Sequence, residues 1–283
     1  MSKRYTTVAF VYDFDGTLVP GSMQEHSFIP SVGYSKKRFW KEVKELAHEN
    51  DMDEISAYML HMCITSNREL KGVRRPLSHK QLKESGAKLP FFAGVPTWFS
   101  RINKLAKSKG VKVEHYIISS GLKEMIAGCK IGRRFKRIFA SSFYYGKDSD
   151  VAAWPANVVN YTTKTQYLFR INKGCHTMSD NKAINHFMEQ ADRPVPFENM
   201  VYFGDGDTDV PCLKVVTQNG GNGVVVYKPK TKGAKEKASK LIKEKRARFM
   251  ATADYRKGRE LEKIAFAIIE TAAARARLDN FTR

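Results

Sequence analysis

Three short apolar runs, far apart in the chain, each end in polar residues. The runs are residues 8–12, 113–118 and 199–203. Runs this apolar predict strands that are buried on both faces, as in a parallel sheet covered by helices. Because the carboxyl ends of parallel strands meet at one edge, where open α/β sheets bind their ligands, we expect the three polar segments to meet there.

The first polar segment, DFDGT, places Asp13 and Asp15 one residue apart. Two carboxylates at a strand end are costly unless a hard cation such as Mg²⁺ neutralises them, which leaves one oxygen free to attack phosphorus. An EF-hand loop is excluded because Gly16 comes two residues too early. An acidic turn without a chemical role is the alternative.

The last polar segment, GDGDTD, adds Asp205, Asp207 and Asp209. If the three strands share one parallel sheet, these carboxylates can converge on Asp13 and Asp15. Five carboxylates at one edge would need a cation.

The middle segment offers the hydroxyls of Ser119 and Ser120 and the backbone N–H of Gly121. Such groups at the start of a helix can bind phosphate oxygens. Taken alone, an ordinary helix cap is the alternative.

Taken together, DFDGTLV, a strand ending in SSGL, a lysine on a helix before the last acidic strand, and GDGDTD resemble the haloacid dehalogenase (HAD) superfamily, in particular its phosphoserine-phosphatase-like members. The order of the four motifs matches over residues 8–215. The resemblance implies an α/β fold with a Rossmann-like doubly wound parallel sheet, Mg²⁺ as the cofactor, and hydrolysis of phosphomonoesters.

The resemblance also implies roles for single residues. Asp13 would be the nucleophile that forms an aspartyl-phosphate, and Asp15 would protonate the leaving oxygen and then activate water. Thr17 would orient Asp15. Ser119 would hold the transferring phosphoryl group, with Ser120 as the alternative.

By the same resemblance, Mg²⁺ would be bound by Asp13, Asp205 and the backbone carbonyl of Asp15. Asp209 would hold metal-bound waters or the lysine.

Lys164, Lys173 and Lys182 are the candidates for that lysine. In SDNKAINHF, Ser179 or Asp180 can cap a helix whose apolar residues recur at helical spacing, so Lys182 lies on a predicted helix. The resembled family places its lysine on such a helix, about two dozen residues before the acidic strand end, which favours Lys182.

Residues 21–90 form a long insertion between the first two motifs, with apolar residues every three or four positions in FWKEVKELAHEN and EISAYMLHMCI. This spacing predicts helices. In the resembled family a helical cap at this point closes over the active site and selects small-molecule substrates. Gln24, Glu25 and His26 are our candidates for substrate contact, and a solvated helix start is the alternative for them.

The predicted core comprises residues 1–20 and 91–283. Within it, residues 141–174 are rich in aromatic and β-branched residues, with Gly146 and Pro155 as breaks, and predict a β-ribbon beside the active site. We find no match to the acidic and basic pair with which phosphoserine-phosphatase-like enzymes recognise serine. The sequence therefore does not select phosphoserine.

The formal net charge is +20, and it is densest between Lys228 and Arg248. A basic helix there suits a polyanion such as nucleic acid. We prefer a solvated basic face, because no aromatic residues are interleaved for base stacking and no nucleic-acid-binding motif is present. The last basic helices, in residues 230–283, include an apolar stripe that is expected to pack back onto the core or onto a partner.

No stretch approaches the ~18 apolar residues of a membrane span, and the four cysteines are widely spaced with no C-x-x-C. We predict a cytoplasmic, Mg²⁺-dependent phosphomonoester hydrolase that acts on a small phosphorylated metabolite. A phosphotransferase or mutase with the same aspartyl-phosphate is one alternative. A nucleic-acid-binding protein, or a phosphatase of polynucleotide ends that uses the basic helix, is the other.

Overall fold

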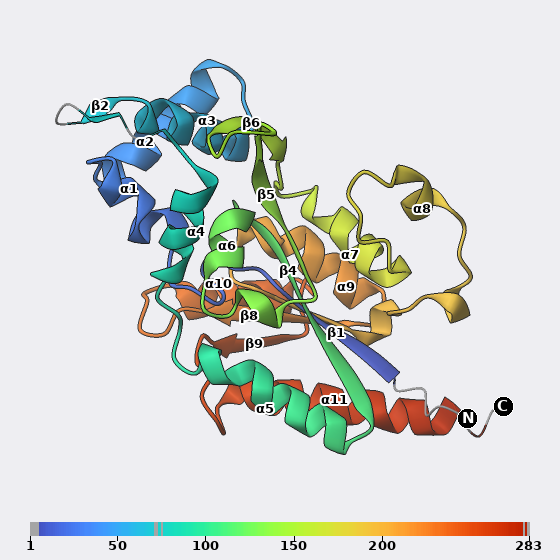
Figure 1. Cartoon of the computed structure of the whole chain (residues 1–283). Helices are drawn as coiled ribbons and strands as arrows, with labels where there is room; N and C mark the ends of the chain where they lie inside the picture. The colour runs from blue at the N-terminus through green and yellow to red at the C-terminus, as the bar shows by residue number, and fades with distance from the viewer. Residues whose placement is uncertain (1–5, 71–72, 75, 280, 282–283) are drawn as a thin grey trace.

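The computed structural model describes residues 6–70, 73–74, 76–279 and 281. The strands of its central sheet are β1 (Thr6–Tyr12), β4 (Val111–Leu122), β5 (Arg137–Tyr145), β6 (Ala152–Asn157), β7 (Met200–Gly204), β8 (Asn222–Tyr227) and β9 (Phe249–Thr252). They lie in the order β6-β5-β4-β1-β7-β8-β9, and every neighbouring pair is parallel except β5 and β6. The sheet runs through the middle of the molecule (Figure 1).

Helices cover both faces of this sheet. One face carries α5 (Val95–Ser108) and α11 (Glu260–Asp279). The other carries α7 (Lys164–Lys173), α9 (Val210–Gln218) and α10 (Ala234–Lys243). The predicted doubly wound α/β fold is confirmed.

The alternation along β1 explains why its sequence is apolar from Val8 to Tyr12. Val8, Phe10 and Tyr12 pack into the apolar cluster with α5 and α11, whereas Ala9 and Val11 pack into the cluster with α7 and α9. All five are fully buried. Successive side chains of a strand point to opposite faces, so a sheet with helices on both faces needs apolar residues at every position.

A chain of buried hydrogen bonds joins β1, β4 and α5. Trp98 Nε1 donates to the Tyr12 hydroxyl (2.9 Å), which lies 3.1 Å from His115 Nδ1. His115 Nε2 lies 3.0 Å from Asn103 Oδ1. Because the amide oxygen only accepts, Nε2 carries the proton and Tyr12 donates to Nδ1, so a neutral His115 completes the network.

This network predicts an acid sensitivity that depends on His115. Burial, together with Arg134, lowers the pKa of His115 from 6.5 to about 3. Between these values the unfolded chain binds one more proton than the folded protein, so the free energy of unfolding falls as the pH falls below 6.5, by up to about 1.4 kcal/mol per pH unit. Urea unfolding at pH 7 and pH 5 tests this. The free energy of unfolding should fall more between these pH values for wild type than for His115→Leu, and an equal fall in both proteins would contradict the prediction.

The segment between β1 and α5 is helical, as predicted. It contains the 3₁₀ turn η1 (Met23–His26) and the helices α1 (Phe28–Ser31), α2 (Lys36–Glu49), α3 (Glu54–Ser66) and α4 (His79–Ala87). A short antiparallel pair, β2 (Glu69–Leu70) and β3 (Val73–Arg74), follows α3. Figure 1 shows α1, α2 and α3 gathered at one end of the molecule, with β6 beside α3. Its role as a cap stays a prediction.

The β-ribbon predicted for residues 141–174 is only half right. β5 and β6 form an antiparallel hairpin, but residues 164–173 form the helix α7. Ile171 follows Leu168 by three residues and Tyr167 by four, and all three are buried on one face of that helix. Aromatic and β-branched residues here serve a helix because tertiary packing outweighs strand propensity.

Two further helices, α6 (Lys123–Gly128) and α8 (Asn181–Asn185), complete the elements that the site requires. The predicted packing of the C-terminal segment is confirmed, because Leu261, Ala265 and Ile269 of α11 are buried in the core. In the basic stretch, α10 turns Ala238 and Leu241 inward and its lysines outward. Among the described helices, none has the length and apolarity that crossing a bilayer requires.

Candidate active site

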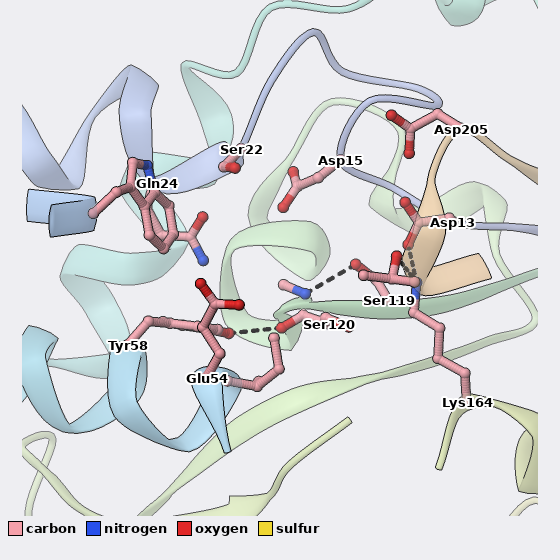
Figure 2. Close-up of a pocket in the computed structure, with 14 residues that line it drawn as sticks. Asp13, Asp15, Ser22, Gln24, Glu54, Tyr58, Ser119, Ser120, Lys164 and Asp205 are labelled. Atoms are coloured by element: carbon pink, nitrogen blue, oxygen red, sulfur yellow. Dashed lines mark hydrogen bonds and ion pairs between the residues drawn. The ribbon is translucent and has the colours of Figure 1, made fainter. Parts of the chain in front are cut away.

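The three polar segments meet at one edge of the sheet, as predicted. β1 lies between β4 and β7, so Asp13 stands between the SSG segment of β4 and the acidic loop after β7. The backbone N–H of Asp13 donates to the carbonyl of Phe203 on β7 (2.8 Å). Together with Asp15, these segments line a pocket (Figure 2).

Lys164 lies at the centre of this edge. It comes from the first turn of α7, its side chain is 1% exposed, and its Nζ donates to Asp13 Oδ1 (2.9 Å) and Asp209 Oδ1 (2.7 Å). Burial alone would lower the pKa of Lys164, but the two carboxylates outweigh it and raise the pKa above its usual value. The site therefore holds a permanent buried cation next to Asp13.

The assignment of Lys182 as the active-site lysine is wrong. Lys182 is exposed on α8, a short surface helix that Asp180 caps through the N–H of Ala183 (2.9 Å), and Figure 1 shows α8 on the far side from α1 to α3. The predicted helix forms, but it buries none of its residues. Lys173, the third candidate, donates to the carbonyls of Ile184 and His186.

Asp209 positions the lysine and the acidic loop. Its Oδ1 also accepts from the Tyr202 hydroxyl (2.7 Å), and its Oδ2 accepts from the backbone N–H of Asp205 (3.1 Å). Both oxygens are thus used within the protein. Asp207, by contrast, is exposed and paired with Lys237 (2.9 Å), so the expectation that it joins the cluster is wrong.

Asp15 faces the pocket and is held by the backbone of the neighbouring helical segment. The N–H of Met23 donates to Asp15 Oδ1 (2.9 Å). Burial, and next the charge of Asp13, raises the pKa of Asp15 well above its usual value. Thr17 makes no such contact: its hydroxyl is buried without a hydrogen-bond partner among the described residues, and its carbonyl accepts from Tyr255 (2.8 Å).

Two glycines allow this close packing. Gly16 has φ +76°, and a Cβ there would lie 2.0 Å from Asp205 Oδ2. A Cβ on Gly121 would lie 2.2 Å from Met23 Cε and 3.0 Å from Asp15 Oδ2. Gly16 is needed because a carboxylate approaches the backbone directly, and Gly121 is needed chiefly because the Met23 side chain does so.

Ser119 and Ser120 both line the pocket. Ser119 Oγ accepts from the N–H of Gly121 (3.0 Å), which shapes the strand end (Figure 2). Ser120 Oγ is buried and has no partner in the described part of the chain. Either hydroxyl is therefore placed to meet a ligand, and the choice between them stays a prediction.

The acidic edge fits a hard divalent cation. Asp13, Asp205 and Asp209 each offer an oxygen, and these oxygens lie within 4.8 Å of one another. Burial and repulsion from Asp209 raise the pKa of Asp13 to about 7 against the opposing effect of Lys164. Burial, and next repulsion from Asp209 and Asp13, raises the pKa of Asp205 well above its usual value. Mg²⁺ prefers oxygen ligands such as carboxylates, and a bound cation would offset the repulsion among these three.

Of the three residues predicted to contact substrate from the helical segment, only Gln24 lines the pocket. Glu25 accepts from Lys36 Nζ (2.9 Å) and Trp40 Nε1 (3.0 Å), and His26 Nε2 lies 2.7 Å from the Pro20 carbonyl. Glu25 and His26 are therefore structural, and the prediction of substrate contact is wrong for both.

Sequence reasoning missed five lining residues of the helical segment: Ser22, Trp40, Glu54, Ile55 and Tyr58. The Tyr58 hydroxyl donates to the Ser120 carbonyl (2.7 Å) and ties this segment to the strand end. Glu54 and Tyr58 are four residues apart on α3, so they share a helix face, but nothing in the sequence tells which face covers the nucleophile.

The family model described as haloacid dehalogenase-like hydrolase matches residues 10–214. An uncharacterised protein of Borreliella burgdorferi is 31% identical, over 92% of this chain and 96% of its own.

Solved structures share the fold. A phosphoserine phosphatase with a phospho-aspartyl intermediate analogue is 16% identical, with a TM-score of 0.55 over 92% of this chain and 97% of its own. A probable phosphoserine phosphatase of Vibrio cholerae is 13% identical, with a TM-score of 0.56 over 96% of this chain and 67% of its own.

Proposed function

The chain belongs to the haloacid dehalogenase-like hydrolase family, and from this premise we propose that it is a Mg²⁺-dependent phosphomonoester hydrolase. The observation that carries the proposal is the buried contact of Lys164 with Asp13 and Asp209 at a strand edge that also presents Asp205 and Ser119. A nucleophilic carboxylate next to a fixed cation suits transfer of a phosphoryl group.

In the proposed reaction, an oxygen of Asp13 bonds to phosphorus as the bond to the leaving alcohol breaks. Asp15 gives its proton to that alcohol, in keeping with the raised pKa that favours its protonated form at the start. Asp15 then takes a proton from the water that attacks the aspartyl-phosphate, which releases phosphate and restores Asp13. Lys164 and Ser119 or Ser120 stabilise the phosphoryl oxygens.

Asp13, Asp205 and the backbone carbonyl of Asp15 would hold Mg²⁺, which supplies further neutralisation of phosphoryl charge when bound. Asp209 is left to hold Lys164. A small phosphorylated metabolite is the proposed substrate, because the residues of the helical segment line the pocket directly above the nucleophile. Binding of a polyanion by α10 and a cytoplasmic location stay predictions.

Removal of the metal tests the proposal. We expect EDTA to lower turnover of a generic aryl phosphate by at least about 100-fold, because the carboxylates and the phosphate would then repel one another. Added Mg²⁺ should restore turnover, and Ca²⁺ should do so poorly because it prefers more ligands and longer bonds. Undiminished turnover after exhaustive chelation would refute the metal dependence.

A further inference from the structure

The pocket wall that faces the nucleophile from the helical segment carries an unpaired carboxylate. Glu54 is half-buried at the start of α3 and lines the pocket, yet its side-chain carboxylate makes no hydrogen bond or ion pair with another described residue. Figure 2 shows Gln24, Glu54 and Tyr58 on one side of the pocket and Asp13, Asp15 and Asp205 on the other. Glu54 is therefore free to pair with a group of the substrate.

Two aromatic rings on the same wall are held in place by their polar edges. Tyr58 donates its hydroxyl to the Ser120 carbonyl (2.7 Å), and Trp40 donates its Nε1 to Glu25 (3.0 Å), which Lys36 also pairs. The two rings lie edge to face, with centroids 6.2 Å apart. Because their polar groups are used, what they offer a ligand is their apolar and π surface.

The described lining presents no available cation, and its other polar side chains are hydroxyls, carboxylates and the Gln24 amide. Gln24 Oε1 is buried without a partner among the described residues. Lys164 is the single basic residue of the described lining, and Asp13 and Asp209 already neutralise it. A substrate carboxylate against this wall would meet Glu54 without a compensating charge, whereas an ammonium group would find a carboxylate and aromatic rings.

We propose that the physiological substrate is a phosphomonoester of an amino alcohol, with its ammonium group at Glu54, Trp40 and Tyr58 and with no neighbouring carboxylate. This assignment rests on the proposed phosphatase function. It predicts that Glu54 sets substrate choice and has no part in the chemistry at phosphorus.

The experiment compares phosphoethanolamine and phosphocholine with ethyl phosphate, glycerol phosphate and O-phosphoserine, and with p-nitrophenyl phosphate as a generic substrate. We expect kcat/KM for the two ammonium esters to exceed that for ethyl phosphate, glycerol phosphate and O-phosphoserine by about tenfold or more. Glu54→Gln should remove this preference by lowering kcat/KM for the two ammonium esters about tenfold or more relative to kcat/KM for p-nitrophenyl phosphate, because the amide keeps the shape of the carboxylate and loses its charge. Glu45→Gln, an exposed carboxylate of α2, is the matched control and should change nothing.

Trp40→Leu is a second, independent test because it removes the aromatic π face. It should lower kcat/KM for phosphocholine and phosphoethanolamine more than for ethyl phosphate. The inference is overturned if wild type hydrolyses p-nitrophenyl phosphate but treats ethyl phosphate, glycerol phosphate or O-phosphoserine as well as the ammonium esters. It is also overturned if Glu54→Gln keeps the wild-type preference. A wild-type enzyme that hydrolyses none of the panel, p-nitrophenyl phosphate included, would contradict the phosphatase function itself and the inference with it.

Discussion

Replacement of Asp13 by asparagine is expected to lower kcat by about 10⁴-fold or more, because the amide cannot attack phosphorus. The protein should stay folded. Lys164 keeps its contact with Asp209, and the raised pKa of Asp13 means that its charge is unfavourable in the folded state. The free energy of unfolding of Asp13→Asn should therefore equal or exceed that of wild type at pH 8.

Asp207→Asn is the matched control, because it changes an exposed carboxylate of the same acidic loop. We expect its kcat to stay within about threefold of wild type. If Asp13→Asn retains turnover within tenfold of wild type, Asp13 is not the nucleophile.

Replacement of Lys164 by methionine is expected to damage both activity and stability. The change leaves Asp13 and Asp209 buried without the cation that they share, which costs about 3–5 kcal/mol of unfolding free energy when one partner of a buried ion pair is removed. Turnover should fall by about 10²–10⁴-fold, because a fixed charge at the transferring phosphoryl group is lost. Urea unfolding and kcat, measured at saturating Mg²⁺, test the two effects separately.

Lys182→Met serves as the comparison for Lys164→Met. Lys182 is exposed on α8, so its loss should leave both measurements unchanged. Loss of activity in Lys182→Met with normal activity in Lys164→Met would reverse the assignment.

The sheet and its active edge were predictable because burial on both faces leaves a direct mark in the sequence. β1 is apolar from Val8 to Tyr12 and β7 from Met200 to Phe203, and carboxylates follow each of these stretches within two residues. A parallel sheet then brings Asp13 and Asp205 together without further information.

The lysine was not predictable in the same way, although a signal exists. Lys164, Leu168 and Ile171 are spaced as on one helix face, but the aromatic and β-branched residues around them indicate a strand. The segment SDNKAINHF has the clearer N-cap signal, which favours Lys182 in the sequence. A cap does not indicate which side of a helix faces the core.

The pocket wall was beyond sequence reasoning because it depends on how two separate segments pack. Gln24 and Glu25 are adjacent in sequence, but one is buried in the pocket and the other holds Trp40. Glu54 and Trp40 come together only through the packing of α2 on α3.

The central claim, that Asp13 carries the phosphoryl group during turnover, is tested most directly in Asp15→Asn. An aryl phosphate needs no proton on its leaving group, so this variant should release one equivalent of phenolate per enzyme and then stall, because water is not activated. After acid quenching, mass spectrometry should find one phosphoryl group on the peptide that contains Asp13. A burst with the phosphoryl group on another residue, or with none on the protein, would contradict the account.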